Sequence, residues 1–180
     1  MSTYQELSNY KIPAGWKRAS LLRRSIWLLF GKPIVESWLP GTFWRRELLK
    51  IFGARIGLAG RIKPNIRITS PWLLTIGDHC WLGEGLWIDN LSMVTIGDQV
   101  CISQGVYLCT GNHNYKAPSF DLRLGSITID SQAWIAAKSV IAPGTHVGEG
   151  SVVALASVAS GTIPPGVILR GNPAVIISYR

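Results

Sequence analysis

His113 is the side chain in this sequence best suited to proton transfer. It stands in the polar stretch YLCTGNHNYKAPSF, residues 107–120, flanked by Asn112, Asn114 and Tyr115. A neutral imidazole can accept a proton from a hydroxyl group near neutral pH, at the moment when that hydroxyl attacks an electrophile. The stretch therefore offers a candidate for proton transfer, with a solvated loop histidine as the alternative.

This stretch interrupts a six-residue repeat. Neither a helix, with its period of 3.6, nor an alternating strand produces a period of six. A short strand followed by a turn does, when three such sides close one coil and each side turns one aliphatic residue inward. Stacked coils then predict three internal ladders of aliphatic residues. The ladders are Ile56/Ile76/Ile96/Ile129/Val147, Ile62/Leu82/Ile102/Ile135/Val153 and Ile68/Ile88/Leu108/Ile141/Ala159.

Each interruption of the period follows a third side, so every inserted segment leaves the same corner of the coil. In the longest one, Ile129 follows Leu108 by 21 positions where the period allows a step of six. A repeat tolerates a long loop at small entropic cost, and a loop of this length in a compact domain is usually functional or disordered. We therefore expect an extended loop over residues 109–128 that carries His113.

Stacking places two polar residues close to the base of this loop. Asp89 falls one coil away from Cys109, and Asn90 one coil away from Thr110. We expect Asp89 and Asn90, with Asn112 and Tyr115 of the loop, to contact the hydroxyl-bearing acceptor or to orient the imidazole. The alternative for the Asp-Asn pair is turn formation, which both residue types favour.

Other reactive side chains fit poorly as catalysts. Cys109 has no second group placed to activate it as a nucleophile. His79 and His146 occupy turn positions of different coils and do not stack with each other or with His113. This spacing argues against a trihistidine metal site, and we expect no metal.

The net charge of +8 is concentrated at one end of the chain. Residues 1–61 hold 11 Lys and Arg against 3 Asp and Glu, whereas residues 62–180 hold 7 of each. Apolar residues at helical spacing predict helices over 19–30 and 43–53, with breaks at Pro33 and Pro40 between them. No nucleic-acid-binding motif is present. A basic, aromatic-rich cap fits an anionic membrane surface or a solvated helical face.

Length and composition bound the organisation. The 180 residues suit one domain, and three cysteines without framework spacing are typical of reduced thiols in a cytoplasmic protein. No signal peptide or spanning segment is apparent. We expect a helical cap over 1–55, a parallel β-helix of about five coils over 56–161, and a C-terminal segment over 162–180.

The repeat resembles that of the hexapeptide-repeat acyltransferases, which are left-handed parallel β-helices. The chain closes on IPPGVILRGNPAVII, residues 163–177, which is similar to the closing segment of that family. WIDNLS, VTIGD and CISQGVYLCTG, together with a Trp- and Arg-rich helical stretch over 18–53, are similar to the colanic-acid-biosynthesis, WcaF-like O-acetyltransferases. The resemblance implies left-handedness, a homotrimer, acetyl-CoA as co-substrate, and His113 as general base.

The resemblance also implies an acyl-CoA groove along the coils that follow the loop. Mapped onto this sequence, its residues are Ala136, Ala137, Lys138, Ala154, Leu155, Ser160 and Arg170. Alanine at 136 and 154 replaces the more usual glycine, Leu155 replaces a small residue, and Gly161 replaces a lysine. Leu155 could narrow the channel, and Lys138 or Arg170 could supply the missing charge. For the alanines, coil packing is the alternative to direct contact.

These implications together predict transfer of an acetyl group from acetyl-CoA to a sugar hydroxyl in surface or exopolysaccharide biosynthesis. The expected location is the cytoplasm, at the inner face of the membrane if the basic helices bind lipid. One alternative is an acetyltransferase for a free small sugar or a xenobiotic alcohol. The other is a non-catalytic β-helix that binds partners or acts as a scaffold.

Overall fold

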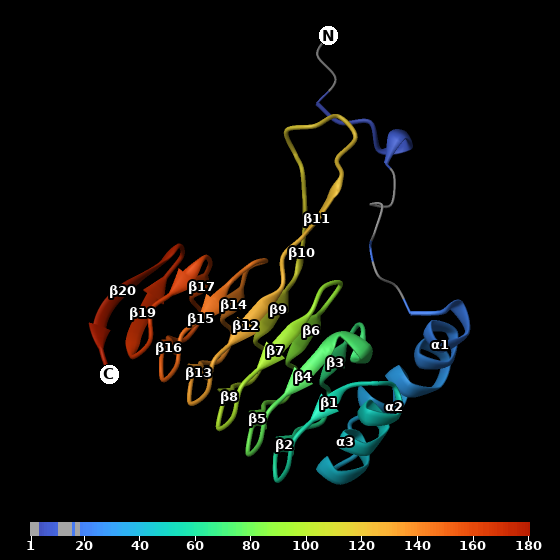
Figure 1. The fold of residues 1–180 in the computed structure, drawn as a ribbon, viewed down its shortest axis with the longest axis horizontal. Helices are drawn as coiled ribbons and strands as arrows, with labels where there is room; N and C mark the ends of the chain where they lie inside the picture. The colour runs from blue at the N-terminus through green and yellow to red at the C-terminus, as the bar shows by residue number, and fades with distance from the viewer. Residues whose placement is uncertain (1–3, 11–15, 17–18) are drawn as a thin grey trace.

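The computed structural model describes residues 4–10, 16 and 19–180, and its main feature is a three-sided parallel coil (Figure 1). Face A consists of β1 (Arg55–Ile56), β4 (Leu74–Ile76), β7 (Val94–Ile96), β12 (Ile127–Ile129), β15 (His146–Val147) and β18 (Thr162–Ile163). Face B consists of β2 (Arg61–Ile62), β5 (Trp81–Leu82), β8 (Cys101–Ile102), β13 (Trp134–Ile135), β16 (Val152–Val153), β19 (Val167–Gly171) and β20 (Ala174–Tyr179). Face C consists of β3 (Arg67–Ile68), β6 (Trp87–Asp89), β9 (Tyr107–Cys109), β14 (Val140–Ile141) and β17 (Val158–Ala159).

The strand register confirms all three predicted ladders. Ile76 pairs with Ile96 on face A, Leu82 with Ile102 on face B, and Ile88 with Leu108 on face C, all in parallel. The remaining ladder pairs follow the same register. Every ladder residue except the partly buried Ile56 is buried. Each such aliphatic side chain contributes about 1.5–3 kcal/mol, which makes the ladders the main source of stability.

Each side of the coil turns two residues inward rather than the one predicted. Leu74, Val94 and Ile127 are fully buried two positions before their ladder residues on face A. Side chains of a strand alternate between its two faces, so residues i and i−2 both face the interior. The six-residue period reveals only the ladder residues, which are all aliphatic. The buried residues two positions before them also include Cys, Ser and Thr, so they do not stand out in the sequence.

The coil continues beyond the five turns predicted, to about six. β18 pairs with β15 and β19 pairs with β16, both in parallel and in register with the coils before them. β20 then folds back antiparallel onto β19. This return covers the last edge of face B, which would otherwise expose unpaired backbone groups.

The helical cap covers the first coil at the opposite end (Figure 1). It comprises α1 (Leu21–Ile26), the π-helical stretch η2 (Trp27–Gly31), α2 (Lys32–Val35) and α3 (Thr42–Ile51). The predicted break at Pro33 is wrong, since the helix runs through it. Proline removes one backbone N–H and crowds the preceding turn, and a π-helical turn just before it accommodates both effects. Short 3₁₀ turns, η1 (Leu7–Asn9) and η3 (Pro71–Leu73), complete the described helices.

Arg45 holds the connection between α2 and α3. Its side chain is fully buried, and its guanidinium donates hydrogen bonds to the carbonyl oxygens of Val35, Gly41, Ser37 and Leu39. These four carbonyls belong to a connecting segment that has few ladder partners of its own. Arg45, one of the 11 basic residues of residues 1–61, is thus the internal clamp of the cap. Within residues 4–10, 16 and 19–180, none of the helices combines the length and apolarity that crossing a bilayer requires.

Candidate active site

The extended loop forms a β-hairpin that projects from the corner between faces C and A (Figure 1). Its strands are β10 (Gly111–His113) and β11 (Leu122–Leu124), and they pair antiparallel with His113 opposite Leu122. The sequence predicted an extended loop here without predicting strands. The hairpin fixes the backbone of His113 at its end, where a free loop would leave the imidazole unpositioned.

The imidazole of His113 is held on two sides. Its Nδ1 lies 2.8 Å from the carbonyl oxygen of Phe120, and the two rings stack at 4.3 Å with an interplanar angle of 8°. A carbonyl oxygen can only accept a hydrogen bond, so Nδ1 carries the proton. In the neutral imidazole Nε2 is then the unprotonated nitrogen, with a lone pair available to take a proton from a hydroxyl group. The arrangement is the one that a general base requires.

An N-terminal segment lies against the same hairpin. The backbone N–H of Glu6 donates to the carbonyl oxygen of Pro118 at 2.7 Å, and the ring of Tyr10 lies 6.1 Å from that of His113. The sequence analysis assigned residues 1–55 as a whole to the cap at the end of the coil. Residues 4–10 lie beside the hairpin instead, so two segments far apart in the chain border His113.

Asp89 and Tyr107 form a polar cluster at the corner below the hairpin. Asp89 stacks on Cys109 as predicted, and its two carboxylate oxygens accept hydrogen bonds from the hydroxyls of Thr69 (3.0 Å) and Tyr107 (3.2 Å). Burial, together with the neighbouring Cys109 and Asp89, raises the pKa of Tyr107. Tyr107 therefore remains a protonated donor that holds the carboxylate in one orientation. The sequence analysis missed this tyrosine because the six-residue repeat marks only its inward neighbour Leu108 and says nothing of outward positions.

Asn90 serves the turn rather than the surface. Its side chain is fully buried, its Oδ1 accepts from the N–H of Ser70, and its Nδ2 donates to the carbonyl oxygens of Ser70 and Leu73. This geometry favours turn formation, the alternative that the sequence left open, over contact with an acceptor. Asn112 is exposed and accepts a bond from the backbone N–H of His113, and Tyr115 is exposed farther along the hairpin loop.

Four of the residues implied for donor binding line one groove of about 700 Å³ on face B. They are Ala136, Ala137, Ala154 and Leu155, which lie at successive turns after β13 and β16. The rest of the lining was not predicted and consists of Ser103, Gln104, Trp134, Val152, Ile168 and Arg180. Leu155 is 66 % exposed and stands at the rim, so it narrows the mouth without filling the groove. Pockets of this size are typical of ligand sites.

The implied basic contacts are placed differently. Lys138 lies over Gly105, and Ser160 and Arg170 are exposed, all three outside the lining of this groove. Arg180 lines the groove instead, held by hydrogen bonds from its guanidinium to the carbonyl oxygens of Gln132 and Gly150. Arg180 follows the repeat, and no periodic signal marks it. It supplies a cation at the groove where the sequence lacks the usual lysine.

The remaining histidines take no part in these sites. His79 has a left-handed backbone, with φ of 57°, at a turn as expected. His146 lies in β15 rather than in a turn, and its Nε2 contacts Asp130 at 2.7 Å on the outside of face A. In the part of the chain that the structure describes, no group of three or more His, Cys, Asp or Glu residues gathers as metal ligands would.

Comparison with known proteins gives the family. No family model matches the chain. It is 37% identical over 178 residues to a protein of Escherichia coli assigned to colanic acid biosynthesis as the acetyltransferase WcaF, a match that covers 98% of this chain and 97% of that one. It is 31% identical to the galactoside O-acetyltransferase of Escherichia coli over 74% of this chain and 67% of that one. The fold matches a hexapeptide-repeat acetyltransferase from Vibrio cholerae, solved with acetyl-CoA, with a TM-score of 0.79, 25% identity and coverage of 88% of each chain. The chain therefore belongs to the hexapeptide-repeat acetyltransferases, in the branch that includes the colanic acid biosynthesis acetyltransferases.

Proposed function

We propose that the protein transfers an acetyl group from acetyl-CoA to a hydroxyl group of a sugar in the biosynthesis of a surface polysaccharide. The observation that carries this proposal is the hydrogen bond from Nδ1 of His113 to Phe120, which leaves Nε2 as a base. The names of the relatives, which include a colanic acid biosynthesis acetyltransferase and a galactoside O-acetyltransferase, support the acceptor class. The Vibrio structure with acetyl-CoA supports the donor.

The reaction needs one proton carrier and no covalent intermediate. Nε2 of His113 takes the hydroxyl proton as the sugar oxygen attacks the thioester carbonyl carbon. The C–S bond then breaks, and the thiolate of coenzyme A leaves with the proton that the imidazolium returns. A backbone amide of the coil stabilises the negative oxygen in between. Asp89, held by Thr69 and Tyr107, offers a fixed carboxylate to a second hydroxyl of the sugar.

The exterior of the coil supports a homotrimer. Outward positions on face A are polar, and include Thr75, Thr95 and Thr128. Outward positions on face C are mostly apolar, and include Trp87, Tyr107, Val140 and Val158, with the first two rings stacked at 4.6 Å. Copies packed through these apolar faces would bury the residues and remove their apolar surface from water. Sedimentation equilibrium on the purified protein measures the number of copies.

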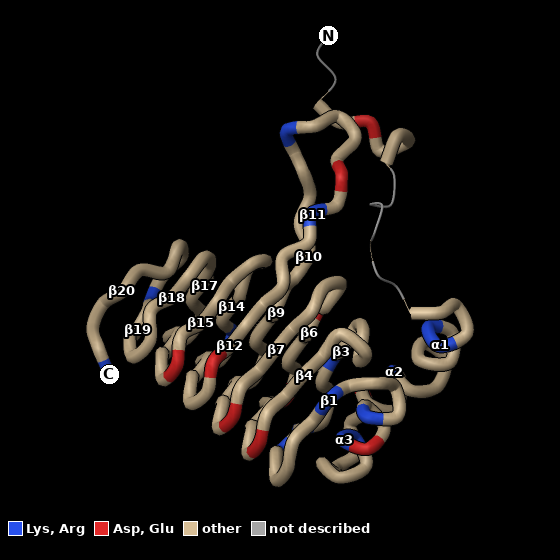
Figure 2. Tube along the Cα trace, in the orientation of Figure 1, with Lys and Arg blue, Asp and Glu red and all other residues tan. Residues whose placement is uncertain are grey.

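The cap supports attachment to the cytoplasmic side of a membrane. Lys and Arg residues of α1 and α3 lie on the cap end of the molecule (Figure 2). Co-sedimentation with phosphatidylglycerol vesicles is expected to occur at low salt and to fall as salt rises, because exposed charges are screened. Absence of binding at every salt concentration would leave the cap a solvated surface.

The experiment that tests the proposed function is His113→Ala with a soluble sugar acceptor. We expect kcat to fall by about 10²–10⁴-fold, the usual contribution of general-base catalysis, with acetyl-CoA binding unchanged. His146→Gln is the matched control, because it removes a histidine of the same coil region outside the site. A His113→Ala enzyme within about tenfold of the parent would remove His113 from the mechanism, whereas a parent that acetylates no sugar would reopen the non-catalytic alternative.

A further inference from the structure

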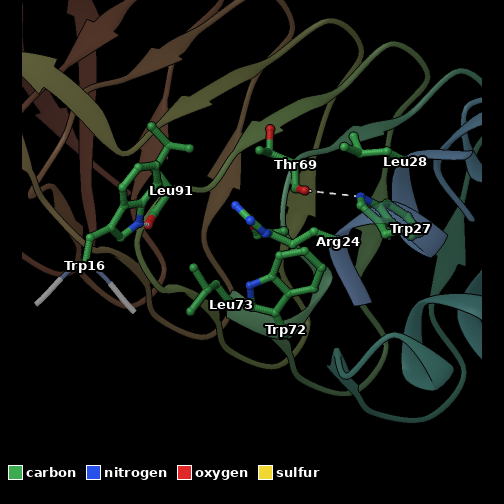
Figure 3. Close-up of a pocket in the computed structure, with 9 residues that line it drawn as sticks. Trp16, Arg24, Trp27, Leu28, Thr69, Trp72, Leu73 and Leu91 are labelled. Carbon is green, nitrogen blue, oxygen red and sulfur yellow. Dashed lines mark hydrogen bonds between the residues drawn. The ribbon is translucent and has the colours of Figure 1, made fainter. Parts of the chain in front are cut away.

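A second pocket, of about 220 Å³, lies between the cap and the corner that carries the hairpin (Figure 3). Three tryptophans and three leucines dominate its lining, which consists of Trp16, Arg24, Trp27, Leu28, Thr69, Ser70, Trp72, Leu73 and Leu91. Trp27 is fixed by a hydrogen bond from its Nε1 to the carbonyl oxygen of Thr69 at 3.1 Å. Such a rigid aromatic wall fits an apolar chain.

Arg24 is the one charged residue in this lining. Figure 3 shows its side chain reaching between Thr69 and Trp72 toward Leu91. Its Nε is buried, and neither a hydrogen-bond partner for that nitrogen nor a carboxylate within ion-pair distance is found in the described part of the chain. Its neighbour Arg23 is used structurally, through a bond to the carbonyl oxygen of Phe52 at 2.7 Å. A partly buried cation without a counter-charge favours an anionic ligand.

This pocket is joined to the acceptor corner by shared residues. Thr69 lines the pocket, and its hydroxyl donates to the carboxylate of Asp89. Leu91 lines it too, and a Cβ added at Gly111 in the hairpin would lie 3.1 Å from the side chain of Leu91. Asn90 holds Ser70 and Leu73 of the pocket wall from behind. A ligand in the pocket would therefore lie next to the Asp89 cluster.

On its other side the pocket meets an exposed apolar surface. Leu28 lines the pocket and is 58% exposed. Around it on α1 and η2, further large apolar side chains face outward, namely Leu21, Leu22, Ile26, Leu29 and Phe30. Lys and Arg residues of the cap lie on the same end of the molecule (Figure 2). Apolar side chains combined with basic charge are the pattern of helices that rest on an anionic membrane.

We propose that this pocket binds the phosphate end of a lipid-linked acceptor, a sugar joined through a phosphate or diphosphate to a polyisoprenyl chain. The phosphate pairs with Arg24, the first isoprenyl units contact the tryptophans, and the rest of the chain follows the apolar surface of α1 and η2 into the bilayer. The sugar then reaches Asp89 and His113. A pocket of 220 Å³ is smaller than the 300–1,000 Å³ usual for drug-sized ligands, which favours a phosphate with a short length of chain over a whole nucleotide. The assignment of the acceptor rests on the proposed function.

Binding of farnesyl phosphate to the purified protein, measured by calorimetry, tests the pocket directly. We expect farnesyl phosphate to bind at least about tenfold more tightly than farnesol, inorganic phosphate or the soluble nucleotide sugar UDP-glucose. Arg24→Gln is expected to remove that advantage, because it deletes one charge-assisted contact. Arg24→Lys is expected to retain most of it. Lys50→Gln, which removes the same charge from α3 of the cap, is expected to leave binding unchanged.

Three results would overturn the proposal. Equal weakening by Arg24→Gln and Lys50→Gln would indicate attraction to the general charge of the cap. Binding of inorganic phosphate or UDP-glucose as tight as that of farnesyl phosphate would indicate an anion or nucleotide site. The third result is a parent protein that folds cooperatively, as its melting curve shows, and yet does not bind farnesyl phosphate. That result would exclude this pocket as a lipid-phosphate site.

The same variants separate this proposal from the proposed function. His113→Ala is expected to bind farnesyl phosphate normally and to lose transfer to a soluble sugar. Arg24→Gln is expected to bind acetyl-CoA as the parent does, measured as the rise in melting temperature that bound acetyl-CoA produces. Normal farnesyl phosphate binding with unimpaired His113→Ala turnover would defeat the role of His113 alone, whereas a parent protein that binds farnesyl phosphate and acetylates no sugar would defeat the proposed function alone. Lost turnover in His113→Ala with no farnesyl phosphate binding would defeat the lipid-linked acceptor alone.

Discussion

The carbonyl oxygen of Phe120 accepts a hydrogen bond from Nδ1 of His113, while the ring of the same phenylalanine stacks on the imidazole. One residue thus sets both the tautomer and the plane of the proposed base. Phe120 adopts a left-handed backbone, with φ of 49°, to present its carbonyl in this way. Bulky side chains seldom occupy that region, so the turn is held by the hairpin around it.

Phe120→Ala separates the two contributions. Alanine keeps a Cβ and hence a similar backbone cost at this φ, but it removes the stacked ring. We expect kcat to fall by about tenfold, a smaller loss than in His113→Ala, with the KM for acetyl-CoA unchanged. Lys116→Ala, in the same hairpin loop but exposed, is the control and is expected to match the parent. A Phe120→Ala enzyme with full kcat would show that the ring plays no part in positioning the imidazole.

Tyr107→Phe tests whether the Asp89 carboxylate must be held in place. The substitution keeps the ring that stacks on Trp87 and removes only the hydroxyl that donates to Asp89. We expect the KM for the sugar to rise by at least about tenfold, with a larger rise in Asp89→Asn, because a lost hydrogen bond to a charged group costs about 1.5–3 kcal/mol and about 1.4 kcal/mol is a factor of ten. Steady-state kinetics of the two single variants and the double variant measure the coupling. Fully additive effects would mean that the two residues act independently.

Ala154→Trp tests the donor groove on face B. An indole at this position would occupy the groove between Ala136 and Leu155, because all three line the same cavity. At 100 times its dissociation constant, acetyl-CoA stabilises a protein by about 2.7 kcal/mol, which shifts the melting temperature by degrees. We expect the parent to show this shift and Ala154→Trp to lose it. Leu155→Ala opens the rim and is expected to keep the shift, whereas an unchanged shift in Ala154→Trp would place the donor elsewhere.

Arg45→Leu tests the clamp of the cap. The substitution leaves buried carbonyl oxygens of the segment between α2 and α3 without donors, and each such group costs about 1–3 kcal/mol. We expect the free energy of unfolding in urea to fall by at least about 2 kcal/mol, or the cap to unfold in a separate, earlier transition. Arg46→Gln, which removes a partly buried charge paired with Glu47, is expected to lower the urea midpoint much less than Arg45→Leu. Equal stability of Arg45→Leu and the parent would contradict the role assigned to the clamp.

The coil could be predicted from the sequence because its aliphatic ladder residues recur every six positions on two of its three sides. Ile88 and Leu108 fall at the same phase of a strict period, and the structure pairs them directly. The helical cap lacks such a constraint. Pro33 looked like a break, but a π-helical turn absorbs it, and only tertiary packing against the first coil decides between those outcomes.

Residues of the candidate site could be predicted from the sequence where the stacking register of the coils sets their positions. Asp89 and Cys109 follow from stacking, and His113 from the broken period. Tyr107, Arg180 and the Phe120 carbonyl did not follow, because their positions depend on how side chains and the hairpin fold over the coil. Residues 4–10 also lie beside His113. They are held there by a backbone hydrogen bond from Glu6 to Pro118 and a ring contact of Tyr10 with His113, and no local sequence pattern predicts either contact.

All inserted segments leave from one corner, whereas the other two corners keep turns of constant length in five successive coils. A gain or loss of residues at that corner disturbs no ladder pairing, since the strands on both sides re-enter the same register. Evolution can therefore lengthen, shorten or replace the hairpin while selection for stability acts on a different part of the molecule. The coil can therefore stay unchanged while substitutions and length changes in the corner hairpin alter which acceptor the protein accepts.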